Sequence, residues 1–283
     1  MSYLKIRKDS FRINFNDYIY NIDEVLKLEC EKISNFEHTK LLEYCLEGGK
    51  RIRPIIMILS AEGISKKNSE SINSAACVVE LLHTVSLIHD DYVDKSTTRR
   101  GKNSYYIKFG NIGTISIGKF VMGLILDICY RKNLTCILSE LSNMVIQMCK
   151  GEIVESKLRD KKISFDDYLH VIEMKTAISF EKAAKIGAII AGGNQEQIRS
   201  FSNFGKLLGT AYQLRDDLDD WKNGDGLLQI LNDNESKFEH ELLENQLSKI
   251  GQEALNEIQK MNLNTPAMKL LVALLLQKSV TKT

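Results

Sequence analysis

Proline is nearly absent from this chain, and its absence limits the fold more than any other feature of the sequence. The chain has 283 residues but only two prolines, at positions 54 and 266. The long stretches between them place apolar residues three and four positions apart, and none alternates apolar with polar residues as a half-buried strand does. The sequence therefore predicts an all-α bundle, with short connections marked by glycine or serine.

Composition and charge exclude several classes of protein. Apolar residues make up 43% of the chain, enough for a sizeable core, and the formal net charge of +1 argues against a nucleic-acid partner. The chain is long for one domain, but no linker or change in composition divides it. We therefore predict a single domain over residues 1–283.

The sequence also predicts a cytoplasmic protein without a transmembrane segment. The first residues lack the apolar core of a signal peptide. The most apolar stretch, residues 115–130, is interrupted by Lys119 and Asp127 and is short for a membrane span. Cysteines stand at positions 30, 45, 77, 129, 136 and 149, mostly in apolar helical runs and without CxxC spacing. This pattern indicates buried, reduced thiols rather than a zinc site or a redox pair.

Residues 80–100 carry the first group of candidate site residues. They read ELLHTVSLIHDDYVDKSTTRR, so Asp90 and Asp94 share one face of a predicted helix. Two carboxylates on one face repel each other unless a cation binds there, and their oxygens suit Mg²⁺, which keeps waters and takes phosphate oxygens. Arg99 and Arg100 add positive charge suited to phosphate. Taken alone, the cluster fits a solvated helix end equally well.

A second carboxylate cluster favours the functional interpretation. Residues 209–221 read GTAYQLRDDLDDW and place Asp216, Asp217 and Asp220 after an apolar run, again at helical spacing. Chance rarely produces both clusters in one chain. They predict two helices that face each other across a site for a metal ion and a diphosphate.

A basic turn precedes both clusters. Residues 48–54 read GGKRIRP, where glycine lets the backbone approach a ligand, and Lys50 and Arg53 can direct cationic donors at a diphosphate. Pro54 can begin the next helix, because its missing N–H is not needed there. A basic turn without function is the alternative.

Together these motifs resemble those of the trans-polyprenyl diphosphate synthases, the head-to-tail isoprenyl transferases. Residues 48–54 resemble the GGKRxRP motif, residues 90–94 the first aspartate-rich motif, and residues 212–220 the FQxxDDxxD motif. Residues 174–176 resemble the KT motif. The motifs follow the family's order over most of the chain, and as a set they are highly specific.

The resemblance implies an isoprenoid synthase type I fold, a helical bundle around a deep central cavity, in one polyprenyl synthetase domain that forms a homodimer. It implies Mg²⁺ as the cofactor, bound by Asp90, Asp91, Asp94, Asp216, Asp217 and Asp220. It implies that isopentenyl diphosphate is bound by Lys50, Arg53, His83 and Arg100. It assigns to the allylic prenyl diphosphate Arg99, Lys175, Thr176 and Gln213.

The resemblance also implies a reaction. An allylic diphosphate ionises, isopentenyl diphosphate attacks the resulting cation, and loss of a proton gives an all-trans polyprenyl diphosphate. Charge on the leaving diphosphate is stabilised by Mg²⁺ and by cationic side chains, so no side-chain nucleophile is needed. The catalytic residues that it implies are Asp90, Asp94, Arg99, Lys175 and Asp216.

Three other functions stay open. A class I terpene cyclase uses similar aspartates but needs no isopentenyl site, so Lys50, Arg53 and Arg100 argue against it. A prenyltransferase acting on a peptide or protein would use the same cation chemistry. A non-catalytic subunit of a hetero-oligomeric synthase would not need intact aspartate clusters.

The chain departs from the family at three places. Lys119 stands where the family usually has aspartate, and it changes either a surface pair or the cavity wall. Glu152 stands where the family tends to have glutamine. The loop after Trp221 is shorter and lacks a GKxTxP-like stretch, and Lys222 lies too close to the aspartates to replace the family's loop lysine. This loop bears on lid closure, and so on turnover and substrate choice.

The residues before Asp90 bear on product length. In the family a bulky residue about one turn above this motif stops chain growth, and here Val85 and Ser86 occupy that level. Neither is aromatic, so we predict a product of geranylgeranyl length or longer. Phe120 and Met122, on an expected facing helix, are the alternative floor of the cavity.

Overall fold

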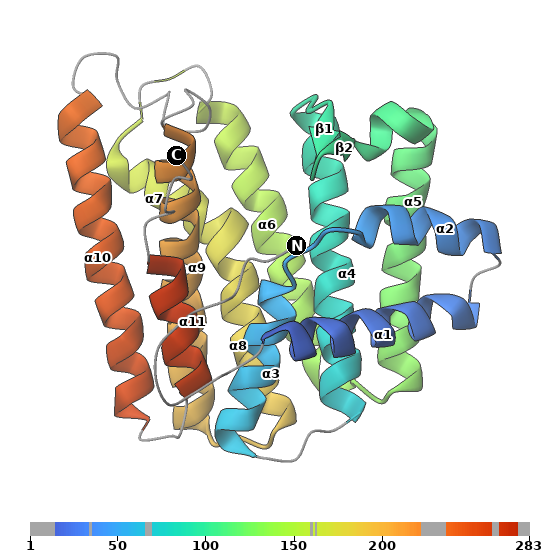
Figure 1. The fold of residues 1–283 in the computed structure, drawn as a ribbon, viewed down its shortest axis with the longest axis horizontal. Helices are drawn as coiled ribbons and strands as arrows, with labels where there is room; N and C mark the ends of the chain where they lie inside the picture. The colour runs from blue at the N-terminus through green and yellow to red at the C-terminus, as the bar shows by residue number, and fades with distance from the viewer. Residues whose placement is uncertain are drawn as a thin grey trace. The chain divides into compact units, whose positions relative to one another are not determined.

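The computed structural model describes residues 15–33, 36–65, 70–158, 161, 163–221, 236–261 and 266–276. Nearly all of them are helical, which confirms the predicted all-α class (Figure 1). The elements are α1 (Phe15–Ile33), α2 (Phe36–Leu46), α3 (Ile52–Ile64), α4 (Glu70–Val93), β1 (Thr98–Arg99), β2 (Lys102–Asn103), α5 (Tyr105–Arg131), a short 3₁₀ turn η1 (Thr135–Ile137), α6 (Leu138–Leu158), α7 (Phe165–Ile172), a π-helical segment η2 (Glu173–Ala177), α8 (Ile178–Ile190), α9 (Gln195–Trp221), α10 (Ser236–Lys260) and α11 (Pro266–Leu276).

The chain divides into two compact units. Unit 1 comprises residues 1–58 and 68–138, and unit 2 comprises residues 59–67 and 139–283. Unit 1 carries the basic turn and the first aspartate cluster, whereas unit 2 carries the KT-like residues and the second cluster. The single domain predicted over residues 1–283 stays a prediction.

Helix α4 is the core of unit 1. Residues 74–82 are buried on every side of the helix, as expected of a helix that is apolar all round. Helix α5 lies along α4, and α1 and α2 pack against both (Figure 1). The unbroken run of buried side chains stops at Leu82, one residue before the first of the candidate site residues on this helix.

A hairpin follows α4 where the sequence predicted no strand. Thr98 pairs with Asn103 and Arg99 with Lys102, so the turn contains only Arg100 and Gly101. Both have positive φ, 53° and 76°, as a type I′ turn requires. Two-residue strands are too short to show an alternating pattern, which is why the hairpin escaped prediction. The hairpin brings Arg99 back to Asp91 on α4 and Arg100 to the backbone of Glu47, which follows α2.

Unit 2 is built on α9, which packs along α8 on one side and α10 on the other (Figure 1). Glycines make the first contact close: a Cβ at Gly205 would lie 2.5 Å from the Phe180 carbonyl oxygen, and one at Gly209 would lie 2.7 Å from Ala177 Cα. A core cluster lies between α7, α9 and α10, formed by Tyr168, Ile172, Ala211, Leu214, Leu218, Leu243 and Leu247. The second aspartate cluster lies on α9, next in sequence to Leu214 and Leu218 of this core cluster.

Helices α4 and α5 are long and apolar enough to cross a membrane by length and composition alone. The helix around residues 115–130 is longer than the sequence indicated, because it begins at Tyr105 and continues across a kink at Gly110, where φ is 73°. In the apolar window of α4, 72% of the residues are buried, and in that of α5, 44%. The burial in α4 is that of a core helix.

The cysteines are all free thiols, as predicted. Cys30, Cys77 and Cys129 are buried, but Cys136 and Cys149 are exposed, so the prediction of burial was wrong for these two. Their neighbours in sequence are apolar, but their side chains face away from the core of their unit. Local composition does not show which side of an apolar segment is exposed.

Candidate functional site

One of the contacts between the basic turn and α4 joins two candidate site residues. Arg53 Nη1 lies 3.0 Å from His83 Nε2, and because arginine can only donate, Nε2 is the acceptor. The proton of the neutral imidazole therefore sits on Nδ1, which is buried and has no protein partner in the described part of the chain. His83 thus offers an unused N–H donor. Lys50, in the same turn, is exposed.

The neutral state of His83 has a physical cause. Burial of the ring lowers its pKa well below the usual value of 6.5, and the nearby charges of Arg53 and Arg100 lower it further. A histidine that stays neutral in the folded protein still takes up a proton in the unfolded chain as the pH falls below its normal pKa. Acid therefore removes stability at this position.

We expect His83→Gln to reduce the acid sensitivity of the fold. We compare the two proteins between about pH 7.5 and pH 5. Below about pH 6.5, the unfolding free energy of wild type should fall by up to ~1.4 kcal/mol more per pH unit than that of the variant. Urea unfolding of both proteins at each pH measures this difference, since the other histidines are common to both. An equal loss in the two proteins would show that His83 is charged in the folded state.

The first aspartate cluster lies at the carboxyl end of α4. Asp90 is half-buried and Asp94, one turn later, is exposed. The negative end of the helix dipole adds to the repulsion between these carboxylates, so a bound cation would relieve an unfavourable potential. Asp91 points elsewhere: it is buried, and its Oδ1 accepts hydrogen bonds from Nε and Nη2 of Arg99. Its predicted role as a metal ligand stays a prediction.

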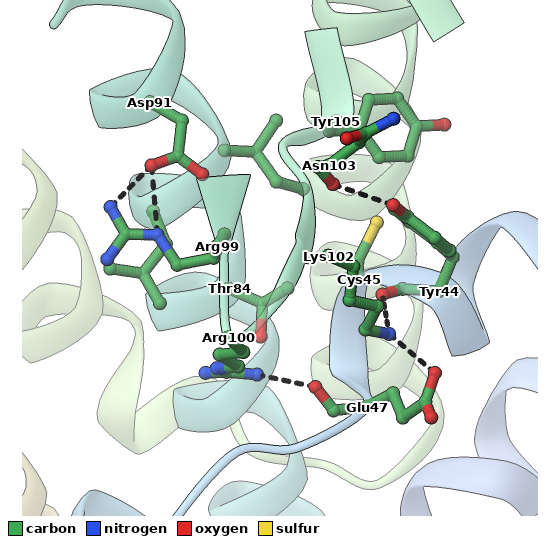
Figure 2. Close-up of a pocket in the computed structure, with 12 residues that line it drawn as sticks. Tyr44, Cys45, Glu47, Thr84, Asp91, Arg99, Arg100, Lys102, Asn103 and Tyr105 are labelled. Carbon is green, nitrogen blue, oxygen red and sulfur yellow. Dashed lines mark hydrogen bonds and ion pairs between the residues drawn. The ribbon is translucent and has the colours of Figure 1, made fainter. Parts of the chain in front are cut away.

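The hairpin and α2 border a pocket on unit 1 (Figure 2). Arg100 Nη1 donates to the backbone oxygen of Glu47 at 3.1 Å, and no carboxylate pairs with Arg100 among the described residues. Burial, together with Arg51 and Arg99, lowers the pKa of its guanidinium. The buried hydroxyl of Thr84, which also lines this pocket, has no hydrogen-bond partner in the described part of the chain. These features suit the guanidinium of Arg100 to binding an anion.

A chain of hydrogen bonds organises unit 2. Thr176 Oγ1 donates to Gln213 Oε1 at 2.9 Å, and Gln213 Nε2 donates to Asp217 Oδ1 at 2.9 Å. The hydroxyl of Tyr168 donates to the other oxygen of Asp217. Burial and this carboxylate raise the pKa of Tyr168, so the hydroxyl keeps its proton. This series of hydrogen bonds fixes both Thr176 and the amide of Gln213 in one orientation.

The remaining aspartates follow on α9. Asp216 is half-buried, and Asp217, its neighbour, is buried in the hydrogen-bond chain. Asp220 follows Asp216 by four residues on α9, and only its backbone belongs to the described structure. The two aspartates of each pair therefore differ in burial: Asp91 and Asp217 are buried, while Asp90 and Asp216 are partly exposed.

Lys175 lies in the π-helical segment η2 between two carboxylates of α6. Its Nζ lies 2.6 Å from Glu152 Oε2 and also pairs with Glu155. Burial would lower the pKa of this ammonium, but Glu155 and Glu152 outweigh it and raise the pKa. Gly151 allows the close approach, since a Cβ there would lie 2.8 Å from Lys175 Cγ. Lys175 is therefore a charged lysine that pairs with two glutamate side chains at once.

Several residues of these sites were not found from the sequence. Tyr168, Thr84 and Glu155 are ordinary helix residues until the fold brings them to the site residues. Glu155 had a weak signal, because it follows Glu152 by three positions and so shares its helix face. The other two had none.

A metal ion at these clusters would need ligands beyond the protein. Among the described residues, no three histidine, cysteine, aspartate or glutamate side chains lie close enough to hold one. Pairs of carboxylates one helical turn apart fit Mg²⁺, which prefers oxygen and completes its shell with water and phosphate. The donor set therefore suits magnesium bound together with a diphosphate.

The departures noted in the sequence have different outcomes. Lys119 is exposed on α5, so it belongs to the surface of unit 1. Glu152 faces Lys175 directly. The short loop after Trp221, including Lys222, lies outside the described residues.

Comparison with known sequences places the chain among prenyl diphosphate synthases. A family model described as polyprenyl synthetase matches residues 37–227. Geranylfarnesyl diphosphate synthase of Methanosarcina mazei is 37% identical over 207 residues, which cover 72% of this chain and 67% of that protein. Octaprenyl diphosphate synthase of Escherichia coli is 37% identical over 180 residues, which cover 63% of this chain and 55% of that protein. The aligned part thus spans only about half of the octaprenyl synthase.

Comparison with solved structures covers nearly the whole chain. A crystal structure of a geranylgeranyl pyrophosphate synthase superposes with a TM-score of 0.80 over 95% of this chain and 100% of that chain, at 20% identity, which shows the shared fold. A geranyltranstransferase from Methanosarcina mazei has a TM-score of 0.75 and 29% identity over 92% of this chain and 96% of that chain. Since the family model spans most of the sequence and contains every motif described above, the chain belongs to the polyprenyl synthetase family.

Proposed function

We propose that this protein is a Mg²⁺-dependent trans-prenyltransferase that condenses isopentenyl diphosphate with an allylic prenyl diphosphate. Its product is an all-trans polyprenyl diphosphate of geranylgeranyl length or longer. We place it in the cytoplasm, working as one polyprenyl synthetase domain over residues 1–283. One observation carries the proposal: Arg53 hydrogen-bonds to a neutral His83 on the same helix that ends in Asp90 and Asp94.

The isopentenyl diphosphate site is assigned to unit 1. Lys50, Arg53 and Arg100 supply positive charge, and His83 Nδ1 supplies a neutral N–H donor. A neutral histidine there binds a phosphate oxygen without depending on protonation near neutral pH. Such a set is not needed by an enzyme that only cyclises one allylic diphosphate.

The allylic diphosphate is assigned to the aspartates, Arg99 and the KT-like residues. Asp90 and Asp94 of unit 1, and Asp216 of unit 2, would serve as Mg²⁺ ligands, and the metal would supply positive charge that neutralises a leaving diphosphate. Arg99 in unit 1 and Lys175 in unit 2 are each proposed to supply positive charge to the leaving diphosphate. Thr176 and Gln213, held by their hydrogen-bond chain, orient the substrate beside Lys175.

The reaction balances without a side-chain nucleophile. The C–O bond of the allylic diphosphate breaks, and its electron pair leaves with the diphosphate. The double bond of isopentenyl diphosphate supplies the electron pair of the new C–C bond. A proton is then lost to the departed diphosphate, which restores a double bond. The two bound substrates thus need only positioning and charge stabilisation from the protein.

Product analysis tests this proposal. Purified protein is incubated with radiolabelled isopentenyl diphosphate, Mg²⁺ and geranyl, farnesyl or geranylgeranyl diphosphate, and the dephosphorylated products are separated by chromatography. We expect labelled all-trans alcohols. A cyclic hydrocarbon formed without isopentenyl diphosphate, label transferred only to a peptide acceptor, or no product with any primer would contradict the proposal.

Product length gives a finer prediction. Val85 is buried on α4, about one turn before Asp90, and Phe120 and Met122 stand on the adjacent α5. Val85→Phe should shorten the main product, because a close-packed wall cannot absorb an added ring. Val85→Ala serves as the matched variant and should give an equal or longer product. An unchanged product in the phenylalanine variant, or farnesol as the sole wild-type product, would show that Val85 does not set the length.

We further propose that the enzyme is a homodimer. Its support is an apolar stripe along the exposed side of α5, where Ile112 is 84% and Tyr130 is 81% exposed, with Ile115 and Leu126 between them. Size-exclusion chromatography with light scattering should give twice the chain mass of 32.2 kDa. Glutamate at both Ile112 and Leu126 should give a monomer, whereas Ser248→Glu on α10 should not. A dimer that persists in the double variant would place the contact elsewhere.

A further inference from the structure

Arg51 stands between Lys50 and Arg53 in the basic turn, but its side chain points into unit 1 rather than toward solvent. It is 5% exposed. Its backbone has a φ of 53°, in the left-handed region that residues with a side chain rarely adopt. A residue held in that conformation needs contacts that keep it there. It has no role in the proposed binding of either substrate.

Three hydrogen bonds hold the Arg51 guanidinium, each to a different helix. Nη1 donates to Glu80 Oε1 on α4, Nε donates to Asp23 Oδ1 on α1, and each distance is 2.7 Å. Nη2 donates at 2.7 Å to the backbone oxygen of Leu46, the last residue of α2. Gly49 leaves room for this side chain, because a Cβ there would lie 2.2 Å from Nη1.

The strongest of these contacts is a buried ion pair. Glu80 is 2% exposed, while Asp23 is half-exposed. A buried carboxylate with its partner removed is costly, so Arg51 and Glu80 depend on each other. Burial would lower the pKa of Arg51, but Glu80 and Asp23 more than offset it. The guanidinium therefore stays charged and fixed.

The geometry couples Arg51 to the proposed substrate residues. Glu80 and His83 are three residues apart on α4 and so share a face. Arg51 bonds to the first and Arg53 to the second, which gives two parallel links between the basic turn and one face of α4. Lys50 makes no hydrogen bond or ion pair among the described residues, so its place depends on the backbone next to it.

We propose that Arg51 is a positioning residue of the isopentenyl diphosphate site, which orients Lys50 and Arg53 by fixing their turn to α4 without contacting substrate. This inference rests on the proposed function and adds a residue to it. We give the same positioning role to Glu80, the buried partner of Arg51 on α4.

Arg51→Lys is the test, because lysine keeps the charge but cannot direct donors at three acceptors at once. Loss of such charge-assisted hydrogen bonds should raise KM for isopentenyl diphosphate by about tenfold or more, with KM for the allylic substrate unchanged within about twofold. Isothermal titration of isopentenyl diphosphate alone should show the same weakening. Glu80→Gln should act in the same direction, and it replaces the lysine variant if that protein does not fold.

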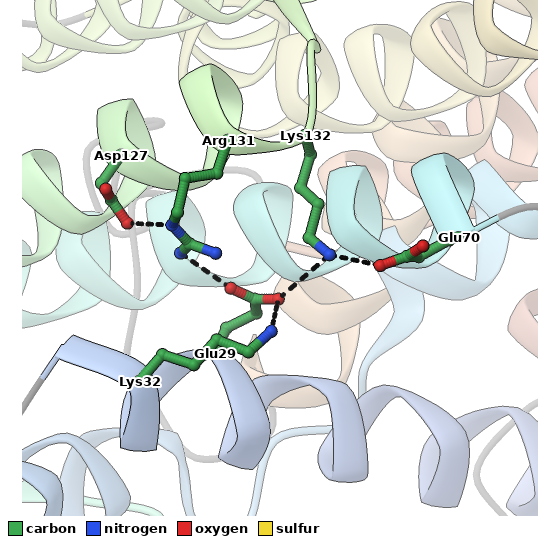
Figure 3. A network of polar contacts seen from close by, with 6 residues as sticks. All are labelled: Glu29, Lys32, Glu70, Asp127, Arg131 and Lys132. Atoms are coloured by element: carbon green, nitrogen blue, oxygen red, sulfur yellow. Dashed lines mark hydrogen bonds and ion pairs between the residues drawn. The ribbon is translucent and has the colours of Figure 1, made fainter.

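Unit 1 contains a matched control in a second arginine bridge (Figure 3). Arg131 bonds to the buried Glu29 at 2.9 Å and to the partly exposed Asp127 at 2.6 Å, so it too joins a buried glutamate and a partly exposed aspartate. Arg131→Lys should lower the melting temperature without changing KM for either substrate.

The outcomes separate the two proposals. If Arg51→Lys raises both KM values equally, or if it behaves as Arg131→Lys does, Arg51 has only a structural role. If wild type binds isopentenyl diphosphate and Arg51→Lys binds it equally well, the positioning role is wrong and the proposed function stands. If wild type does not bind isopentenyl diphosphate at all, the proposed function is itself wrong.

Discussion

Replacing Asp90 with alanine should lower kcat by about 100-fold or more, the scale observed when one group that stabilises developing charge is removed. Asp90 lies in the last turn of α4, four residues before Asp94, where the helix dipole already disfavours negative charge. Without it, Mg²⁺ would lose an oxygen ligand and the diphosphate would leave with less compensation. Asp216→Ala should have a comparable effect from unit 2. Steady-state turnover with labelled isopentenyl diphosphate measures both.

Asp127→Ala is the control for Asp90. Asp127 is a partly exposed aspartate near the end of α5, where it pairs with Arg131, and it has no part in the proposed site. Its variant should keep wild-type turnover.

EDTA should abolish activity in wild type, and added Mg²⁺ should restore it. Full activity in EDTA, or a loss in Asp127→Ala equal to that in Asp90→Ala, would rule out metal binding by Asp90.

Replacing Lys175 with alanine should slow ionisation of the allylic substrate by about 100-fold, since a cation at the leaving group is worth roughly 3 kcal/mol in the transition state. Arg53→Ala should instead raise KM for isopentenyl diphosphate. Single-turnover measurements on the allylic substrate separate the two effects. If both variants changed only the allylic substrate's KM, the assignment of two sites would be wrong.

Lys182 gives a close match for Lys175. It also lies between two carboxylates, 2.9 Å from Glu140 and 3.1 Å from Glu181, but on α8 and at 8% side-chain exposure. Lys182→Ala should reduce stability, because Glu181 would lose its paired lysine and Glu140 would keep only Lys185, while the single-turnover rate stays near that of wild type. A rate loss equal to that of Lys175→Ala would mean that both act through the fold.

Much of the molecule could be predicted from local sequence. The helical class follows from apolar spacing and from the scarcity of proline, both of which are local properties. The boundary of α9 follows from a capping pattern as well: Asn194 and Gln197 each accept a hydrogen bond, at 2.9 Å, from the other's backbone N–H. The motif residues were likewise identified because their types and spacing are visible in a single chain.

The partners of those residues could not be predicted in the same way. Nothing in the order of residues 209–221 shows that Asp217 bonds to Tyr168, 49 positions earlier. Nothing near the KT-like segment shows that it forms a π-helical turn or that Lys175 lies between Glu152 and Glu155. The difference between Asp90 and Asp91 also depends on a hairpin too short to be recognised.

By itself, then, the sequence determined the helices, the order of the motifs and the chemical character of each candidate site residue, because these depend on neighbours within one or two helical turns. Only the tertiary structure decided which of those residues are held and which are accessible. Arg51 shows the reason. It lies in the same basic turn as Lys50 and Arg53, which suggests a third substrate cation, yet its carboxylate partners lie 28 and 29 positions away in Asp23 and Glu80. Burial against distant helices made it part of the scaffold.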